Sequence, residues 1–191
     1  WIKKLQENWR GKLLSQTILE TKDGYASLRE IRIPDYGTKE ANRQFFYFLE
    51  GFIAEGILPL AEQQDEWSEV VNSNYSTWNC TLKYSKLEFF EDLQRIGCMK
   101  NLCSRLNKSE NECYEWLNRL FKFVVDQNDT SILEKFPVIP NQSGDFCLLD
   151  KVCTDSAQRI PDKLKNICVG LLGKNLKDEL MAEAIDDSVF T

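Results

Sequence analysis

The sequence predicts an α+β domain that is mostly helical, with two short β-hairpins or a small mixed sheet. Apolar residues recur at spacings of three and four along much of the 191-residue chain, which is typical of amphipathic helices. Two short apolar runs, around Leu19 and Ile139, are each followed by a glycine and a second apolar run, as in hairpins. A hydrophobic content of 42% is enough to form a core, so the chain is not of the disordered class.

The later hairpin has the clearer turn. Residues 138–140 are the first strand, residues 141–145 the loop and residues 146–149 the return strand. Gly144 can adopt positive φ at little cost, and the side chains of the loop's Asn and Asp can bond the local backbone. We therefore assign Gly144 as a structural turn residue, and Gly24 holds the same place in the earlier hairpin.

The earlier hairpin has a similar layout. Ile18 and Leu19 precede Gly24. Each hairpin is followed by a loop that an Ile-Pro pair marks, Ile33-Pro34 or Ile160-Pro161, and then by a helical segment. One interpretation is two copies of a single unit. The other is two unrelated glycine-turn hairpins, because such signals are common.

The expected organisation is a single domain over residues 1–191. Because the chain opens on Trp1 rather than Met, we expect a fragment of a larger protein, with a processed chain as the alternative. It would comprise a hairpin–helix unit over 13–57, a helical middle over 58–135 and a second hairpin–helix unit over 136–185.

Capping signals and apolar stripes place the helices. Thr38 is the predicted N-cap of a helix that reaches Ile57, and two capping boxes begin at Ser85 and Ser109. Gly97 ends the helix that Ser85 caps. Further helices are expected at 1–16, 59–71, 98–106, 130–135 and 161–173, with a last one after Asn175 and a frayed end from Asp186.

Residues 72–84 are polar and aromatic without helical periodicity, which predicts a loop with a short strand near 79–84. Tyr75 and Trp78 are its candidate partner contacts, because exposed aromatic side chains can anchor a partner. Alternatively, they cover the core.

Charge and cysteine usage exclude several classes of protein. The net charge is −6, whereas nucleic-acid binders usually carry a basic surface, and no apolar run reaches the roughly 18 residues of a membrane span. Neither nucleic acid nor a membrane is therefore an expected partner. The seven cysteines are odd in number and lack close CxxC pairs, which favours a reducing, cytoplasmic location over a disulfide framework.

The search for chemistry predicts no enzyme. The chain has no histidine, which excludes Ser-His-Asp and Cys-His catalysis and His-ligated metals on this chain, and it has no GxxxxGK[ST] or GxGxxG loop. The glutamates around Cys113 disfavour a reactive thiolate there. We expect no catalytic residue, metal or cofactor.

The run EKFPVIPNQSGDFCLL at 134–149 resembles a hairpin of sacsin-like, Hsp90-type (GHKL) ATPase-containing proteins. The similarity extends over roughly 109–181. Such proteins are large, multidomain and chaperone-like, with the ATP-binding module in a separate domain. That module has a Glu/Asn helix and a DxGxG loop; here Asp23-Gly24 lacks the second glycine and Asp145 follows its glycine. The resemblance therefore implies an adjacent, non-catalytic region.

The leading hypothesis is a structural or relay segment of such an ATPase, contacting other domains of the parent protein or client proteins, with any ATP bound elsewhere in the parent. The alternative is an autonomous protein–protein interaction module that uses the Tyr75–Trp78 loop. An unrecognised enzyme ranks third.

Overall fold

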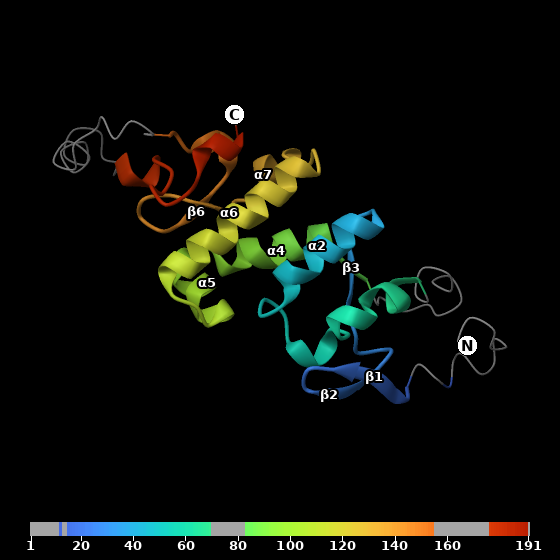
Figure 1. Ribbon diagram of the computed structural model, residues 1–191. Coiled ribbons are helices and arrows are strands. Elements are labelled where there is room, and N and C mark those ends of the chain that lie inside the picture. The colour runs from blue at the N-terminus through green and yellow to red at the C-terminus, as the bar shows by residue number, and fades with distance from the viewer. Residues whose placement is uncertain (1–11, 13–14, 70–82, 155–175, 191) are drawn as a thin grey trace. The chain divides into compact units, whose positions relative to one another are not determined.

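The computed structural model describes residues 12, 15–69, 83–154 and 176–190 (Figure 1). The predicted fold class is confirmed, since the chain is mostly helical with small sheets of two strands each. Its residues group into two compact units, Trp1–Glu88 and Phe89–Thr191. The division of one domain into three segments stays a prediction.

The earlier hairpin lies in the first unit. Strands β1 (Thr17–Thr21) and β2 (Gly24–Ser27) pair antiparallel, and the pairing of Thr21 with Gly24 leaves residues 22 and 23 as the loop. Gly24 has a φ of +125°, which favours glycine. Leu19 and Ala26 face each other on the buried side, so the alternation of the sequence fixes which face packs inward.

A second sheet forms where the sequence predicted a loop. Strand β3 (Ile33–Asp35) pairs in parallel with β4 (Lys83–Ser85). The assignment of Ile33-Pro34 to a loop is therefore wrong. Pro34 has no backbone N–H, but it is tolerated in β3 because β3 is an edge strand, where not every backbone N–H has to donate to a neighbouring strand. The strand predicted near 79–84 overlaps β4, and residues 79–82 lie outside the described residues.

Helix α2 (Lys39–Leu49) begins as predicted and ends early. The Thr38 hydroxyl accepts a hydrogen bond from the Ala41 amide at 3.2 Å, as an N-cap does. The predicted end at Ile57 is wrong, because Glu50 is extended and Gly51 takes a φ of +76°. Phe52 and Ile53, just beyond Gly51, are buried outside the helix, so their spacing reflects burial rather than helical structure.

The segment after α2 is built of short helical turns. They are η2 (Glu55–Ile57), η3 (Ala61–Gln63) and an α-helical stretch at 64–69. The helix predicted over 59–71 is therefore seen from residue 64, and its last two residues lie outside the described part.

Both capping boxes are confirmed. Helix α4 (Lys86–Ile96) follows Ser85, whose hydroxyl accepts from the Glu88 amide at 3.2 Å while the Ser85 amide donates to the Glu88 carboxylate at 2.8 Å. Helix α6 (Glu110–Asp126) has the reciprocal pair between Ser109 and Glu112. Two free backbone donors are thereby satisfied at the start of each helix.

The second unit packs around α6. Its predicted apolar face is buried: Cys113, Trp116, Leu117, Leu120, Phe121 and Val124. Helix α5 (Met99–Leu106) packs on it, α7 (Ser131–Lys135) follows it, and the ring of Phe89 lies 6.2 Å from that of Trp116. The predicted short helices at 98–106 and 130–135 are confirmed.

The later hairpin consists of β5 (Ile139–Pro140) and β6 (Phe146–Cys147), which pair antiparallel. The return strand is shorter than predicted, since a 3-10 turn, η4 (Leu149–Lys151), begins at Leu149. The loop spans residues 141–145, against two residues in the earlier hairpin, so the two turns differ in kind.

The C-terminal part is not a helix. After the 3-10 turn η5 (Leu176–Asp178), Leu180 bridges to Cys153 and Met181 bridges to Asn141. The helix predicted after Asn175 is therefore wrong.

The expectation of a frayed end is also wrong. The Asp186 amide donates to Asn118 Oδ1 at 3.0 Å, and within η6 (Asp187–Phe190) the ring of Phe190 lies 5.7 Å from that of Phe121. These two contacts hold the segment against α6.

The helix predicted over 161–173, and nearly all of that over 1–16, lie outside the described residues. Of the helices that are described, none has both the length and the apolar character required to cross a membrane.

Candidate functional site

Asn141, in the loop of the later hairpin, is a buried polar residue of the second unit that several hydrogen bonds engage. Its side chain is buried, with 2% of the residue exposed. Oδ1 accepts hydrogen bonds from the amides of Ser143 at 3.0 Å and Asp145 at 2.9 Å. Nδ2 donates to the backbone carbonyl of Asp178 at 3.0 Å. Because an Asn amide has both acceptor and donor capacity, one side chain shapes the loop and attaches it to the C-terminal segment.

The β5 edge of the hairpin pairs with that C-terminal segment. The Gln142 amide donates to the Leu180 carbonyl at 2.8 Å, and the Ala182 amide donates to the Pro140 carbonyl at 2.9 Å. The Ser143 hydroxyl adds a 2.6 Å hydrogen bond to the Asp178 carboxylate. Backbone bonds of this kind satisfy amides that burial would otherwise leave unpaired.

The β6 side of the hairpin pairs with the junction between α4 and α5. The Phe146 amide donates to the Gly97 carbonyl at 2.9 Å, and the Met99 amide donates to the Gly144 carbonyl at 2.8 Å. Gly97 also has a φ of +76°, which ends α4 as predicted. The hairpin is thus hydrogen-bonded on both edges. Residues 97–99, 139–147 and 177–182 are named here the hairpin junction.

Cys147 adds a sulfur to the hairpin junction. Asn141 Nδ2 lies 3.5 Å from its Sγ. Burial raises the pKa of the Cys147 thiol, with the Asn141 contact acting in the opposite direction. A thiol rather than a thiolate is therefore favoured, which suits packing more than nucleophilic chemistry.

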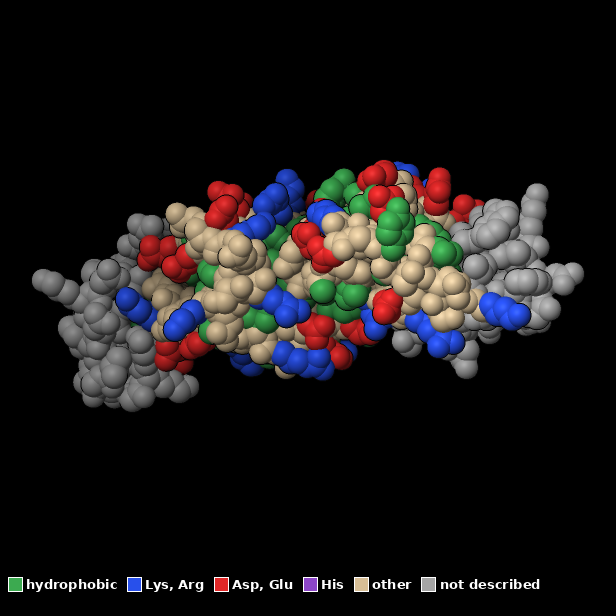
Figure 2. Space-filling model, turned by 90° about the horizontal axis from the view of Figure 1, so that it is seen from below, with side chains coloured by type: hydrophobic (Ala, Val, Ile, Leu, Met, Phe, Trp, Pro, Cys, Tyr) green, Lys and Arg blue, Asp and Glu red, His purple; other side chains and the backbone are tan. Residues whose placement is uncertain are grey.

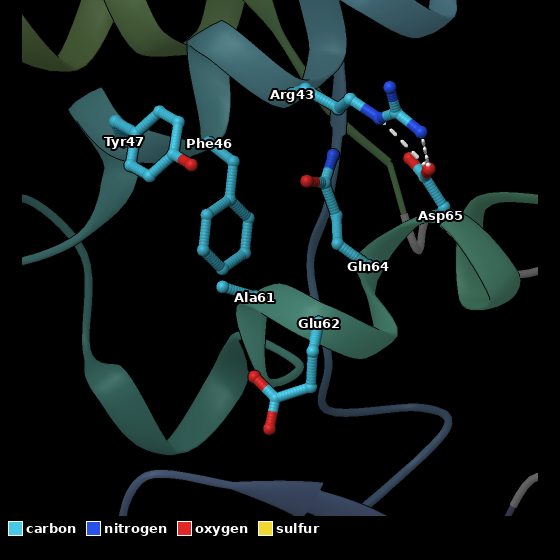
Figure 3. A pocket seen from close by; sticks show the side chains of 7 residues that line it. All are labelled: Arg43, Phe46, Tyr47, Ala61, Glu62, Gln64 and Asp65. Carbon is cyan, nitrogen blue, oxygen red and sulfur yellow. Dashed lines mark hydrogen bonds and ion pairs between the residues drawn. The ribbon is translucent and has the colours of Figure 1, made fainter.

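The first unit carries a hollow of about 180 Å³ between α2 and residues 61–65 (Figure 3). Seven residues line it: Arg43, Phe46, Tyr47, Ala61, Glu62, Gln64 and Asp65. Small-molecule sites usually measure about 300–1,000 Å³, so this hollow is too small for most such ligands and is large enough for a single side chain.

An ion pair forms one wall of the hollow. Figure 3 shows the Arg43 guanidinium directed at the Asp65 carboxylate, and Nε donates at 2.9 Å. These hydrogen bonds hold the pKa of Asp65 below its usual range. The guanidinium is therefore already engaged by a carboxylate.

Gln64 and Tyr47 line other parts of the hollow. Gln64 is buried, and its Nε2 donates to the Asn42 carbonyl at 3.1 Å, which fixes residues 61–65 to α2. Tyr47 is 66% exposed and leaves an aromatic face open to solvent. Sequence reasoning missed Tyr47, although it follows the exposed Arg43 by four positions, which puts both residues on the polar side of α2.

The residues predicted as sites are only partly described. Gly24 and Gly144 both have positive φ, at +125° and +88°. Tyr75 and Trp78 lie outside the described residues. In the described ranges no three or more His, Cys, Asp or Glu side chains gather as a metal ion would require. The expectation of no cofactor or metal in this chain stays a prediction.

The surface in Figure 2 carries Lys and Arg side chains interspersed with Asp and Glu. Some of the oppositely charged side chains form ion pairs, such as Lys22–Glu50 at 2.6 Å and Arg95–Asp92 at 2.6 Å. On this face the charges do not form a continuous basic strip of the kind that tracks a phosphate backbone.

Comparison with protein-family models, with curated proteins and with solved structures found no match to this chain.

Proposed function

We propose that this chain is a non-catalytic structural or relay segment of a multidomain, chaperone-like ATPase of the Hsp90 type. The observation that carries the proposal is the hairpin junction. The run at 134–149, on which the resemblance rests, contains the hairpin, and both of its edges are hydrogen-bonded to segments distant in sequence.

The hydrogen bonds suggest how such a relay works. A displacement of residues 177–182 pulls on the hairpin through the Gln142 and Ala182 amides. The hairpin in turn pulls on Gly97 and Met99, where α4 ends and α5 begins. A glycine with positive φ between two helices can absorb a change of angle, so Gly97 is the proposed hinge.

The proposed partners are other domains of the parent protein or client proteins, with neither nucleic acid nor membrane involved. ATP would bind a separate domain. A cytoplasmic location is proposed from the seven cysteines and their lack of paired spacing.

The direct test is the sequence of the parent polypeptide upstream of Trp1, by mass spectrometry of the intact parent. We expect a Glu/Asn helix followed by DxGxG. A native start at or near Trp1 without that module contradicts the proposal. In the parent, Asn141→Ala should leave ATP hydrolysis nearly unchanged while it lowers client refolding, and Asn118→Ala is the matched control.

A second candidate is an autonomous protein–protein interaction module. The exposed Tyr47 beside the Arg43–Asp65 pair favours it, since aromatic side chains next to a hollow often anchor partners. The sequence prediction for such a module uses the Tyr75–Trp78 loop, which lies outside the described residues. Loss of partner capture on Tyr47→Ala or Trp78→Ala, with an unchanged circular dichroism spectrum, is the expected result for a module. Unchanged capture by both variants contradicts it.

A further inference from the structure

Helices α5 and α6 form a helical hairpin in the second unit (Figure 1). Asn107, with a φ of +52°, ends α5, and Ser109 caps α6, so residues 107–109 make the whole connection. In such a hairpin, residues about one turn before and one turn after the connection face each other. Cys103 and Cys113 occupy those two positions.

The two thiols are in contact. The Cys113 thiol is hydrogen-bonded to that of Cys103 across the two helices. Cys113 is fully buried, with 0% exposed, whereas Cys103 is of intermediate exposure. Cys103 is therefore partly accessible to a solvent-borne reagent, whereas Cys113 is not.

We propose that Cys103 and Cys113 form a modification site, a dithiol that a peroxide-class, two-electron oxidant converts to a disulfide between α5 and α6. The Cys103 thiolate attacks one peroxide oxygen; the O–O bond breaks, Cys103 becomes a sulfenic acid, and the departing hydroxide takes up the proton that the Cys103 thiol released, as the first water. The Cys113 sulfur then attacks the Cys103 sulfur, the S–S bond forms, and the departing hydroxide takes the Cys113 proton as a second water. Two thiols are oxidised and one hydrogen peroxide is reduced.

The surroundings assign the order of the two steps. Burial first, and then the Cys103 contact, raise the pKa of the Cys113 thiol to about 12. This agrees with the sequence prediction that Cys113 does not act as a thiolate. Burial raises the pKa of Cys113 more than the nearby Glu112 does. Cys103 is therefore the attacking residue and Cys113 the resolving one.

The chain offers a clean readout. Trypsin cleaves after Lys100, Arg105, Lys108 and Arg119, which places Cys103 in NLCSR and Cys113 in SENECYEWLNR. The folded whole chain is treated with hydrogen peroxide, alkylated, digested without reductant and analysed by mass spectrometry. We expect these two peptides joined, lighter by two hydrogens than their sum. The pair should be roughly tenfold more abundant than any other cysteine pair, because contact in the fold gives a high effective concentration.

Three controls make the test decisive. Cys153→Ser, which removes an exposed thiol, should leave the joined peptide unchanged. In Cys113→Ser, dimedone should trap a sulfenic acid on Cys103. In urea the preference for the pair should disappear. Oxidation of other thiols of the folded chain without the joined peptide would overturn the proposal, as would dimedone labelling of Cys113 before Cys103.

Discussion

The side-chain amide of Asn141 donates a hydrogen bond to the backbone carbonyl of Asp178, at 3.0 Å, across 37 positions of the chain. The same side chain accepts from two amides of its own loop. One residue therefore determines both the shape of the hairpin loop and its attachment to the C-terminal segment. The proposed relay depends on this double role.

Asn141→Ala should lower the free energy of unfolding by about 3 kcal/mol. The substitution removes three hydrogen bonds between the side chain and backbone groups at a buried position, and each contributes about 1 kcal/mol net. Urea denaturation followed by circular dichroism measures the change.

The matched control for that variant is Asn118→Ala. Asn118 donates to the Ala184 carbonyl at 2.9 Å and accepts from the Asp186 amide at 3.0 Å, but it is more exposed. We expect a loss of about 1 kcal/mol, because water can replace these partners. A loss for Asn118→Ala that equals or exceeds the loss for Asn141→Ala contradicts the central place given to Asn141.

Gly144→Val should destabilise the chain by more than about 1 kcal/mol, because φ is +88° at this position. The reason is backbone conformation rather than space, since an added Cβ would lie 3.9 Å from the Met99 Cβ. Gly144→Asn should cost clearly less, because Asn tolerates positive φ. Equal midpoints of denaturation for the two variants would show that φ is not the cause.

The capping box at the start of α6 predicts a pH dependence. Hydrogen bonds from the Ser109 side chain and backbone lower the pKa of Glu112 from its ordinary 4.5. A lowered pKa in the folded state means that the contribution to stability is complete above the unfolded value and is lost as the pH falls through the folded value. Glu112→Gln should therefore reduce the urea midpoint at neutral pH and have little effect in strong acid.

The Ser109→Ala background provides the control for this pH effect. In that background, the change in urea midpoint caused by Glu112→Gln should depend much less on pH, because the hydroxyl that contributes most to the lowered pKa is gone. If the effect of Glu112→Gln on the urea midpoint keeps its full pH dependence in the Ser109→Ala background, the pH dependence comes from a charge other than the capping box.

Truncation of the two adjacent aromatic residues of α2, Phe46 and Tyr47, should have very different effects on stability. Phe46 is 2% exposed, so Phe46→Ala should lower stability by about 4 kcal/mol through the cavity it leaves. Tyr47 is 66% exposed, and Tyr47→Ala should change stability by less than about 0.5 kcal/mol. Similar losses in thermal denaturation for the two variants would contradict the placement of Tyr47 on the open side of the hollow.

Local signals in the sequence predicted much of the fold. The two capping boxes, the end of α4 at Gly97 and the buried face of α6 each depend on residues within about one or two helical turns. Propensity and pattern act over that range, so the type and the start of these elements could be inferred.

The features that were missed depend on residues far apart in sequence. The parallel pairing of Ile33 with Lys83 gives no local signal. The bridge between Asn141 and Met181 overrides the helical pattern near the C-terminus. In the candidate site, Asn141 could be recognised as a turn residue, but its bond to Asp178 could not.

Amide hydrogen exchange in the whole chain carrying Asn141→Ala tests the central claim most directly. If the hairpin junction is one connected unit, exchange should accelerate together at Met99, Phe146, Gln142 and Ala182, whose amides bond across both edges of the hairpin. Asn118→Ala should leave these four amides nearly unchanged. Acceleration confined to Ser143 and Asp145, the amides that bond the Asn141 side chain itself, would show that the hairpin does not transmit a disturbance from one edge to the other, and would contradict the relay.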